Sequence, residues 1–173
     1  MKFFSTLKAE RCLTQLMSAP DSGSAEARQA LDNLRNIGTP AIPYVIEAFA
    51  TADKAHTGGL ITLLASLLDD KSFPVYADGL THSNKLCVAG VTKALAISDS
   101  YDANKLLGLL GQERVSTGAL IEILGVVRKR LNVRELLKRS YDLEPREKAA
   151  VFKIIGDVAS AELVPDLIAR VEG

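Results

Sequence analysis

The sequence predicts an all-α protein, a right-handed α-solenoid of about five helix pairs preceded by an extra N-terminal helix. Apolar helical stretches end before polar turns at Ile37, Leu68, Ile97, Val127 and Val158, so these ends recur 31, 29, 30 and 31 residues apart. A steady period of this length is typical of stacked supersecondary units. No stretch alternates between apolar and polar side chains as a half-buried strand would. Both observations favour helices throughout.

Composition agrees with a folded helical stack. The chain has 173 residues, of which 47% are hydrophobic and 24% charged, proportions that are usual for a folded protein. Aromatic residues make up 5% and Trp is absent, so the interior must be built from aliphatic side chains. Such a length suits one repeat domain, and we expect residues 1–173 to form a single domain.

The leading helix is expected over residues 5–18, where one side is apolar, and residues 20–24 are rich in turn formers. The first pair is expected over residues 24–51. Apolar residues recur with the i, i+3, i+4, i+7 spacing of one helical face from Ala27 to Ile37 and again from Ile42 to Phe49. Between them, Thr39-Pro40 is a typical helix start, because the hydroxyl can accept from a free amide and proline suits the first turn.

The other four pairs are expected over residues 54–82, 84–111, 114–141 and 145–172. Each repeats the order of an apolar stretch, a short polar turn and a second apolar stretch. In the second pair, Pro74 falls in the first turn of its helix, where the missing N–H is tolerated. The inward face expected for the first helix of the third pair comprises Leu86, Val88, Ala89, Val91, Ala94, Leu95 and Ile97.

Residues 26–43 and 153–167 resemble the short HEAT-like repeat of the phycobilisome-lyase family and of many bacterial scaffold proteins. In both segments a small residue, Gly38 or Gly156, lies near the end of the first helix, and a turn leads to an apolar second helix. The resemblance extends over nearly the whole chain after residue 24. The fourth pair keeps Gly125 but has Arg128-Lys129-Arg130 where small residues are expected. The resemblance implies fold much more than function.

Candidate partner-binding residues follow from the solenoid. In a helical stack of this kind the second helices line an extended concave surface. Seven residues of those helices lie off the apolar face, and the alternative interpretation is that they are merely solvated. They are Tyr44, Glu47, Asp78, Lys105, Lys138, Asp166 and Arg170.

A second candidate surface is a basic patch in the fourth pair, where only Glu135 among the neighbouring charged residues opposes the cations. Such a patch could meet an acidic partner or a phosphate group. The alternative is a solvated helix end, since cations are favourable at a helix C-terminus. The patch comprises Arg128, Lys129, Arg130, Arg134 and Arg139, with Lys138 beside them.

No residue pattern indicates a reaction centre, and we expect no catalytic residue, no metal site and no cofactor. Cys12 and Cys87 have neither metal-binding nor redox spacing and are expected to be small buried hydrophobes in a reducing compartment. Neither His56 nor His82 has a second ligand at i, i+4. The glycines, including the Gly58-Gly59 pair, are interpreted as helix-packing or turn residues.

The sequence therefore predicts a non-catalytic scaffold or adaptor in the cytoplasm, whose partner is a protein or another domain of the same polypeptide. The apolar stripe of the final helix predicts continuation in a longer protein or self-association through the C-terminal helix pair. We expect no membrane association, because no apolar run approaches the roughly 18 residues that a membrane span needs.

Two other functions stay open. The family resemblance permits a bilin lyase-like subunit, which should offer convergent polar and aromatic groups. The fold also resembles HEAT-like DNA-repair proteins, but Lys plus Arg equals Asp plus Glu, 21 against 21. Because nucleic-acid binding depends on positive charge, we do not expect it here.

Overall fold

The computed structural model describes residues 2–158, with side chains from Thr6 onward, and every regular element among them is a helix. The prediction of an all-α protein is therefore confirmed for this part of the chain. None of its helices combines the length and the apolar character that crossing a membrane requires. Contacts divide the chain into two compact units, Met1–Tyr101 and Asp102–Gly173.

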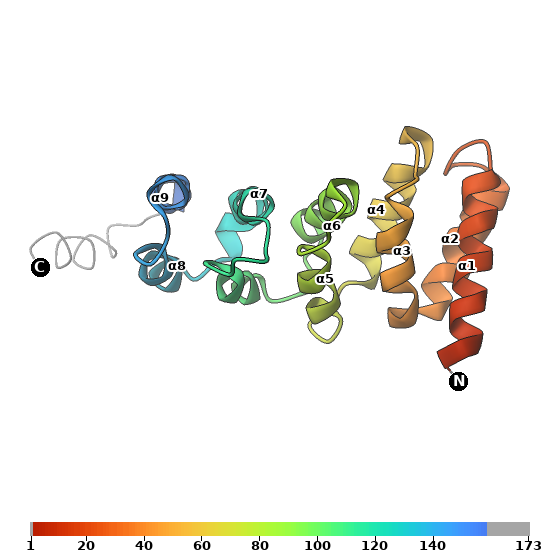
Figure 1. Ribbon diagram of the computed structural model, residues 1–173, viewed down its shortest axis with the longest axis horizontal. Helices are drawn as coiled ribbons and strands as arrows, with labels where there is room; N and C mark the ends of the chain where they lie inside the picture. Colours follow the sequence, from red (N-terminus) through yellow and green to blue (C-terminus); the bar gives the residue numbers. More distant parts are fainter. Residues whose placement is uncertain (1, 159–173) are drawn as a thin grey trace, which may run out of the picture. The chain divides into compact units, whose positions relative to one another are not determined.

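The described part of the first unit contains two rows of helices (Figure 1). In one row α2 contacts α4 and α4 contacts α6, and in the other α1 contacts α3 and α3 contacts α5. The rows also pack on each other, since α1 contacts α2, and α3 contacts α4 and α6. The elements are α1 (Lys2–Ser18), α2 (Ala25–Ile37), the 3-10 helix η1 (Thr39–Ala41), α3 (Ile42–Ala48), α4 (Lys54–Leu67), α5 (Phe73–Gly79) and α6 (Lys85–Ile97).

Local sequence sets where these helices begin and end. The side chains of Ser24, Asp53 and Asn84 each accept a hydrogen bond from an amide in the first turn of α2, α4 and α6. Such caps satisfy amides that have no partner within the helix. At the end of α2, Gly38 has a φ of 74° and donates its N–H to the carbonyl of Leu34. That φ is open to glycine without steric cost, which explains the turn into η1.

Two buried tyrosines donate hydrogen bonds to backbone carbonyls at the C-terminal ends of α4 and α6. Tyr76 is 0% exposed and donates its hydroxyl to the carbonyl of Leu64, at 2.6 Å. Tyr101 donates in the same way to the carbonyl of Leu95, at 2.8 Å. Both carbonyls lie in the last turn of a helix, where they lack an amide partner. Burial raises the pKa of Tyr76, so its hydroxyl keeps the proton that it donates.

The second unit repeats this order of contacts within its described residues. α7 contacts α9, η2 contacts both α7 and α8, and α8 contacts α9. The amide of Asn132, which precedes α8, donates to Asn104 Oδ1 of η2 at 2.6 Å. The elements are the 3-10 helix η2 (Ala103–Leu109), α7 (Thr117–Val127), the 3-10 turn η3 (Arg128–Arg130), α8 (Val133–Ser140) and α9 (Pro145–Val158).

Most predicted helices have a counterpart at the expected place, with three differences. The leading helix begins at Lys2 rather than at residue 5. The second helix of the third pair is a 3-10 helix of seven residues, and Gly108 within it is a poor α-helix former. Leu86 and Ile97 are 56% and 60% exposed and Ala89 is exposed as well, so the predicted burial of these three residues is wrong. The buried stripe of α6 runs through residues 87, 91, 94 and 95, at helical spacing, and the predicted burial of these four is confirmed.

The division between Tyr101 and Asp102 falls inside the third predicted pair, 84–111. The single domain and the right-handed solenoid stay predictions. The second helix of the fifth pair lies outside the described residues.

Candidate functional site

Helix α1 has two faces with different surroundings: one is buried and the other lines a pocket. Ala9, Cys12 and Leu16 are buried, and their spacing places them on one side of α1, which packs against α2 and α3. A second set starts at Glu10 and continues three, four, seven and eight residues later, which is again the spacing of one helical face. This second face of α1 lines a pocket.

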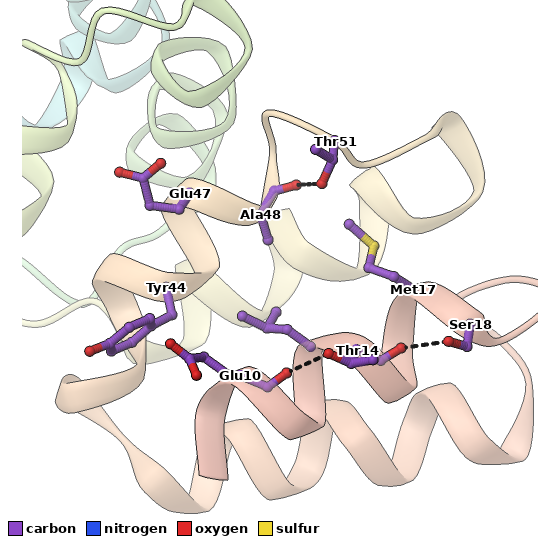
Figure 2. A pocket seen from close by; sticks show the side chains of 9 residues that line it. Glu10, Thr14, Met17, Ser18, Tyr44, Glu47, Ala48 and Thr51 are labelled. Carbon is purple, nitrogen blue, oxygen red and sulfur yellow. Dashed lines mark hydrogen bonds between the residues drawn. The ribbon is translucent and has the colours of Figure 1, made fainter. Parts of the chain in front are cut away.

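The pocket lies between α1 and α3 and has a volume of about 480 Å³. Figure 2 shows its lining, in which the two helices contribute facing side chains. We call it the α1–α3 pocket. Its lining residues are Glu10, Leu13, Thr14, Met17 and Ser18 from α1, Tyr44, Glu47 and Ala48 from α3, and Thr51 just after α3.

The hydroxyl groups of this lining already donate their protons elsewhere. Thr14 and Ser18 donate to carbonyls one turn back in α1, at 3.0 and 2.8 Å, as Figure 2 shows. Tyr44 donates to Thr6 Oγ1 at 2.9 Å, and Thr51 donates to an α3 carbonyl at 3.5 Å. A hydroxyl group that donates its one proton in a hydrogen bond can still accept further hydrogen bonds through its lone pairs. These four hydroxyl oxygens of lining residues therefore act as acceptors for any further hydrogen bond.

The charge of the lining is negative. Glu10 and Glu47 are exposed, and none of the nine lining residues is basic. The cations nearest in sequence to Glu10 are Lys8 and Arg11, which are exposed on α1 but do not line the pocket. In Figure 2 the Glu10 carboxylate lies on the side of Tyr44, whereas the Glu47 carboxylate points away from α1. The pocket is thus suited to a hydrogen-bond donor or a cation.

The structure brings Tyr44 and Glu47 together at the α1–α3 pocket, as neighbours on α3. The other described candidates from the second helices do not line it. Asp78 on α5 and Lys138 on α8 are exposed, and Lys105 on η2 is half-buried. Asp166 and Arg170 lie outside the described residues.

Several cations of the basic patch are engaged within the second unit. Arg128 donates to the carbonyl of Gly125 at 2.6 Å, and its guanidinium lies 3.9 Å from Asp157 of α9. Arg139 donates to Glu135 at 3.0 Å. Glu135 is therefore not the only acidic group beside the patch. Arg130 and Arg134 also take part in polar or electrostatic interactions.

The remaining two cations of this patch are exposed. Lys129 lies on η3 and Lys138 on α8. The patch therefore offers less uncompensated positive charge than its sequence indicates. Its role in binding stays a prediction.

A second group of side chains meets on the far side of Glu47. Glu47 Oε1 lies 3.0 Å from His82 Nε2, and one ligand atom each of Glu47, His82 and Cys87 lies within 4.8 Å of the other two. We call these three residues the Glu-His-Cys cluster. It joins α3 to the link between α5 and α6 and to the first turn of α6, and it combines an exposed carboxylate, a half-buried imidazole and a fully buried thiol.

The hydrogen bonds of His82 define its tautomer. Its Nδ1 accepts the backbone N–H of Asn84 at 2.9 Å, so Nδ1 carries a lone pair. A neutral imidazole then bears its proton on Nε2 and donates it to Glu47. The ring is thereby held with its Nε2 edge toward the other members of the cluster.

Cys87 contributes a protonated thiol. Burial raises its pKa, and the negative charge of Glu47 raises it further. Cys12, the second cysteine, is also buried and free, so the prediction that both are small buried residues is confirmed.

Comparisons with family models, curated proteins and solved structures found no match to this chain. The HEAT-like resemblance therefore stays a prediction. The class of protein that the fold defines is that of all-α proteins, with a two-row helical packing in the first unit.

Sequence reasoning found two lining residues of the α1–α3 pocket and missed the rest, because it assigned α1 only one apolar side. It also missed the Glu-His-Cys cluster, since His82 and Cys87 are five residues apart and Glu47 is 35 residues before His82. The repeat period could have indicated this cluster. In a helical stack, a residue in the second helix of one pair lies near residues about one repeat further along the chain, as Glu47 does near His82.

Proposed function

We propose that this protein is a non-catalytic interaction module, built as a HEAT-like α-solenoid, that binds a protein partner or another domain of its own polypeptide. The two-row packing of the first unit supports a solenoid, since each helix pair of such a stack contacts its neighbours. Two free, buried cysteines fit a location in the reducing cytoplasm.

The observation that carries the proposal is the acceptor-rich lining of the α1–α3 pocket. Four hydroxyl groups have donated their protons elsewhere, and Glu10 adds a carboxylate. A partner segment that carries Lys or Arg would supply the missing donors, because both side chains have donors and no acceptor. Their alkyl stems can lie along apolar surface while the charged end meets a carboxylate. Leu13 and Met17 provide that apolar surface.

The size of the pocket is compatible with this occupant. A volume of about 480 Å³ lies within the range of pockets that bind small molecules, so one long side chain and its flanking residues would fill it. Met17 is unbranched and adapts its shape, which suits a surface that accepts different neighbours of the basic side chain.

The alternatives receive less support. Nucleic-acid phosphates would meet the negative charge of Glu10 and no basic side chain in this lining, which is the wrong sign of charge. A bilin-handling site should gather several aromatic groups, and Tyr44 is the single aromatic residue of this lining.

The test uses Met17 as a reporter. The chain has two methionines, Met1 and Met17, so 13C-methyl labelling gives two signals, which the Met17→Leu variant assigns. Soluble peptides with a central Lys or Arg between Leu residues are titrated into the labelled protein. We expect the Met17 signal to move in a saturable way, and a peptide with a central Glu to leave it in place.

A matched pair of charge variants locates the contact. Glu10→Gln should weaken binding of the basic peptide by about 2- to 5-fold, the worth of one exposed ion pair. Glu113→Gln makes the same change at an exposed position of the second unit and should leave affinity unaltered. Equal binding of the acidic peptide, or equal affinity of the two variants, would contradict the proposal.

A further inference from the structure

The three ligand atoms of the Glu-His-Cys cluster are close enough for one metal ion. They lie within 4.8 Å of one another. Tetrahedral zinc, with bonds of about 2.0 to 2.3 Å, holds such atoms roughly 3.3 to 3.8 Å apart. The cluster therefore needs to contract by little more than about 1 Å along its longest edge. Glu47 Oε1 and His82 Nε2 are already 3.0 Å apart, so the contraction concerns the distances to Cys87 Sγ, and the 66% exposed Glu47 side chain can rotate to shorten its own distance to the sulfur.

We propose that Glu47, His82 and Cys87 bind one Zn²⁺ ion, with water in the fourth position. Sulfur, nitrogen and carboxylate oxygen are the three ligand types that zinc takes in proteins. Mg²⁺ and Ca²⁺ prefer oxygen alone, so a site with one thiolate and one imidazole discriminates against both. The site departs from the sequence-based expectation of no metal.

Two of the ligands are already held in place. Cys87 lies in the first turn of α6 with a fully buried side chain. His82 is oriented by the Asn84 N–H, which Nδ1 accepts at 2.9 Å. Asn84 also caps α6 through its own side chain, which accepts the amide of Leu86 at 2.9 Å. His82 and Cys87 thus lie on either side of the start of α6 before any metal binds, and Glu47 completes the site from α3.

Zinc binding displaces a proton from the Cys87 thiol and one from His82 Nε2. The Cys87 thiol releases its proton to solvent and binds zinc as thiolate. His82 gives up the proton on Nε2, which becomes the ligand atom, and takes one from solvent on Nδ1. The hydrogen bond from the Asn84 amide is then lost. Two N–H donors would then face each other across the 2.9 Å between Asn84 N and Nδ1, so the imidazole must also shift away from the Asn84 amide, and the three zinc–ligand bonds have to offset this cost.

The inference does not rest on the proposed peptide pocket, although Glu47 belongs to both. The metal site would tie α3 to the α5–α6 link whether or not a partner binds. Glu10 lines the pocket and is not part of the cluster, so it separates the two proposals experimentally.

The experiment measures Zn²⁺ binding to the reduced full chain by competition with a chelator, and Co²⁺ binding by absorption. We expect one metal ion per chain. Co²⁺ should give near-ultraviolet thiolate charge-transfer absorption together with the strong visible bands of tetrahedral geometry. Absence of the thiolate absorption in the wild-type protein overturns the proposal, even if Zn²⁺ binds.

Matched variants assign the ligands. Cys87→Ala should abolish the charge-transfer band, whereas Cys12→Ala removes the other buried thiol and should retain it. His82→Asn replaces the ring with a side chain whose Oδ1 can still accept the Asn84 amide, so the link keeps its turn. Circular dichroism checks that each variant is folded.

We expect Cys87→Ala and His82→Asn each to lower zinc affinity more than the roughly 10- to 100-fold that losing an outer hydrogen-bonding partner costs. Unchanged affinity in His82→Asn, or loss of the thiolate band in Cys12→Ala, would refute the site. If the Cys87→Ala variant does not fold, the zinc affinity of the His82→Asn variant alone tests the site. Glu10→Gln should leave zinc affinity unaltered even where it weakens peptide binding.

Discussion

Gly58 and Gly59 are adjacent in α4 but have opposite surroundings. A Cβ atom added to Gly58 would meet nothing within 4 Å. At Gly59 it would lie 2.7 Å from the Ser22 Cβ and 3.3 Å from a methyl group of Leu31. Substituting alanine at each position in turn therefore measures how firmly residues 19–24 are held against α4.

Both substitutions gain the same helix propensity. Alanine is favoured over glycine in a helix interior by about 1 kcal/mol, and the loss of unfolded-chain freedom is shared as well. Gly58→Ala should raise the free energy of unfolding by about 0.5 to 1 kcal/mol. Gly59→Ala carries the same gain and an overpacking cost of about 1 to 3 kcal/mol. The difference between the two variants isolates the packing cost.

Ser22 has little freedom to move aside. Its amide and its hydroxyl both donate to the carbonyl of Ala55, at 3.2 and 2.8 Å. A shift that relieves the new methyl group of Gly59→Ala would lengthen both bonds. The packing cost should therefore fall in the upper part of its range.

Urea unfolding followed by circular dichroism measures the two variants beside the wild type. At about 2 to 4 °C per kcal/mol for a chain of this size, thermal melts should separate them by several degrees. Equal stability of Gly58→Ala and Gly59→Ala would refute the reasoning, since it would mean that residues 19–24 yield without cost.

Three further substitutions test individual contacts. Tyr76→Phe leaves a buried helix-end carbonyl without a partner and should cost about 1 to 3 kcal/mol in urea unfolding; an unchanged midpoint would mean that water replaces the hydroxyl. Gly90→Ala places a methyl group 2.6 Å from the ring of Phe49, so it should destabilise the protein, and Phe49→Leu in the same chain should restore part of the loss. The hydrogen bond from His56 lowers the pKa of Asp53. That contribution to stability is complete above about pH 4, the ordinary aspartate range, and is lost as pH falls through the lowered pKa. Asp53→Asn should remove this acid dependence and keep the helix cap; equal acid sensitivity of wild type and variant would contradict it.

The sequence predicted helices well because caps and apolar spacing are local signals. Pro40 lies in the first turn of η1 as predicted, but the expected Thr39 cap is wrong, because Gly38 holds the cap position and no side chain caps η1; Ser24, predicted as the end of a loop, caps α2. The burial of particular positions was harder to predict where a helix is apolar all round. In α6, Leu86 and Ile97 are as hydrophobic as the buried residues, so only the contacts with α4 and α3 decide which side is covered.

The candidate sites could be predicted only in part, because they join residues from different helices. Tyr44 and Glu47 could be placed on a second helix and off its apolar face. Glu10 could not be assigned to the same pocket, since the approach of α1 to α3 depends on tertiary packing. The cluster of Glu47 with His82 depends on the register between two neighbouring second helices, which a period varying between 29 and 31 residues does not define to one residue.

Glu47 belongs to both proposed sites. Its negative charge determines whether binding at one site strengthens or weakens binding at the other. The Glu47 carboxylate already points away from α1 (Figure 2), so binding Zn²⁺ would act on the α1–α3 pocket only by neutralising its charge, which would leave Glu10 as the acidic group of the lining. A bound metal ion should therefore weaken the affinity of the pocket for a basic side chain. Because coupling between two sites is reciprocal, a basic partner should weaken zinc binding by the same factor. The same carboxylate would then make partner binding responsive to zinc without any movement of the helices.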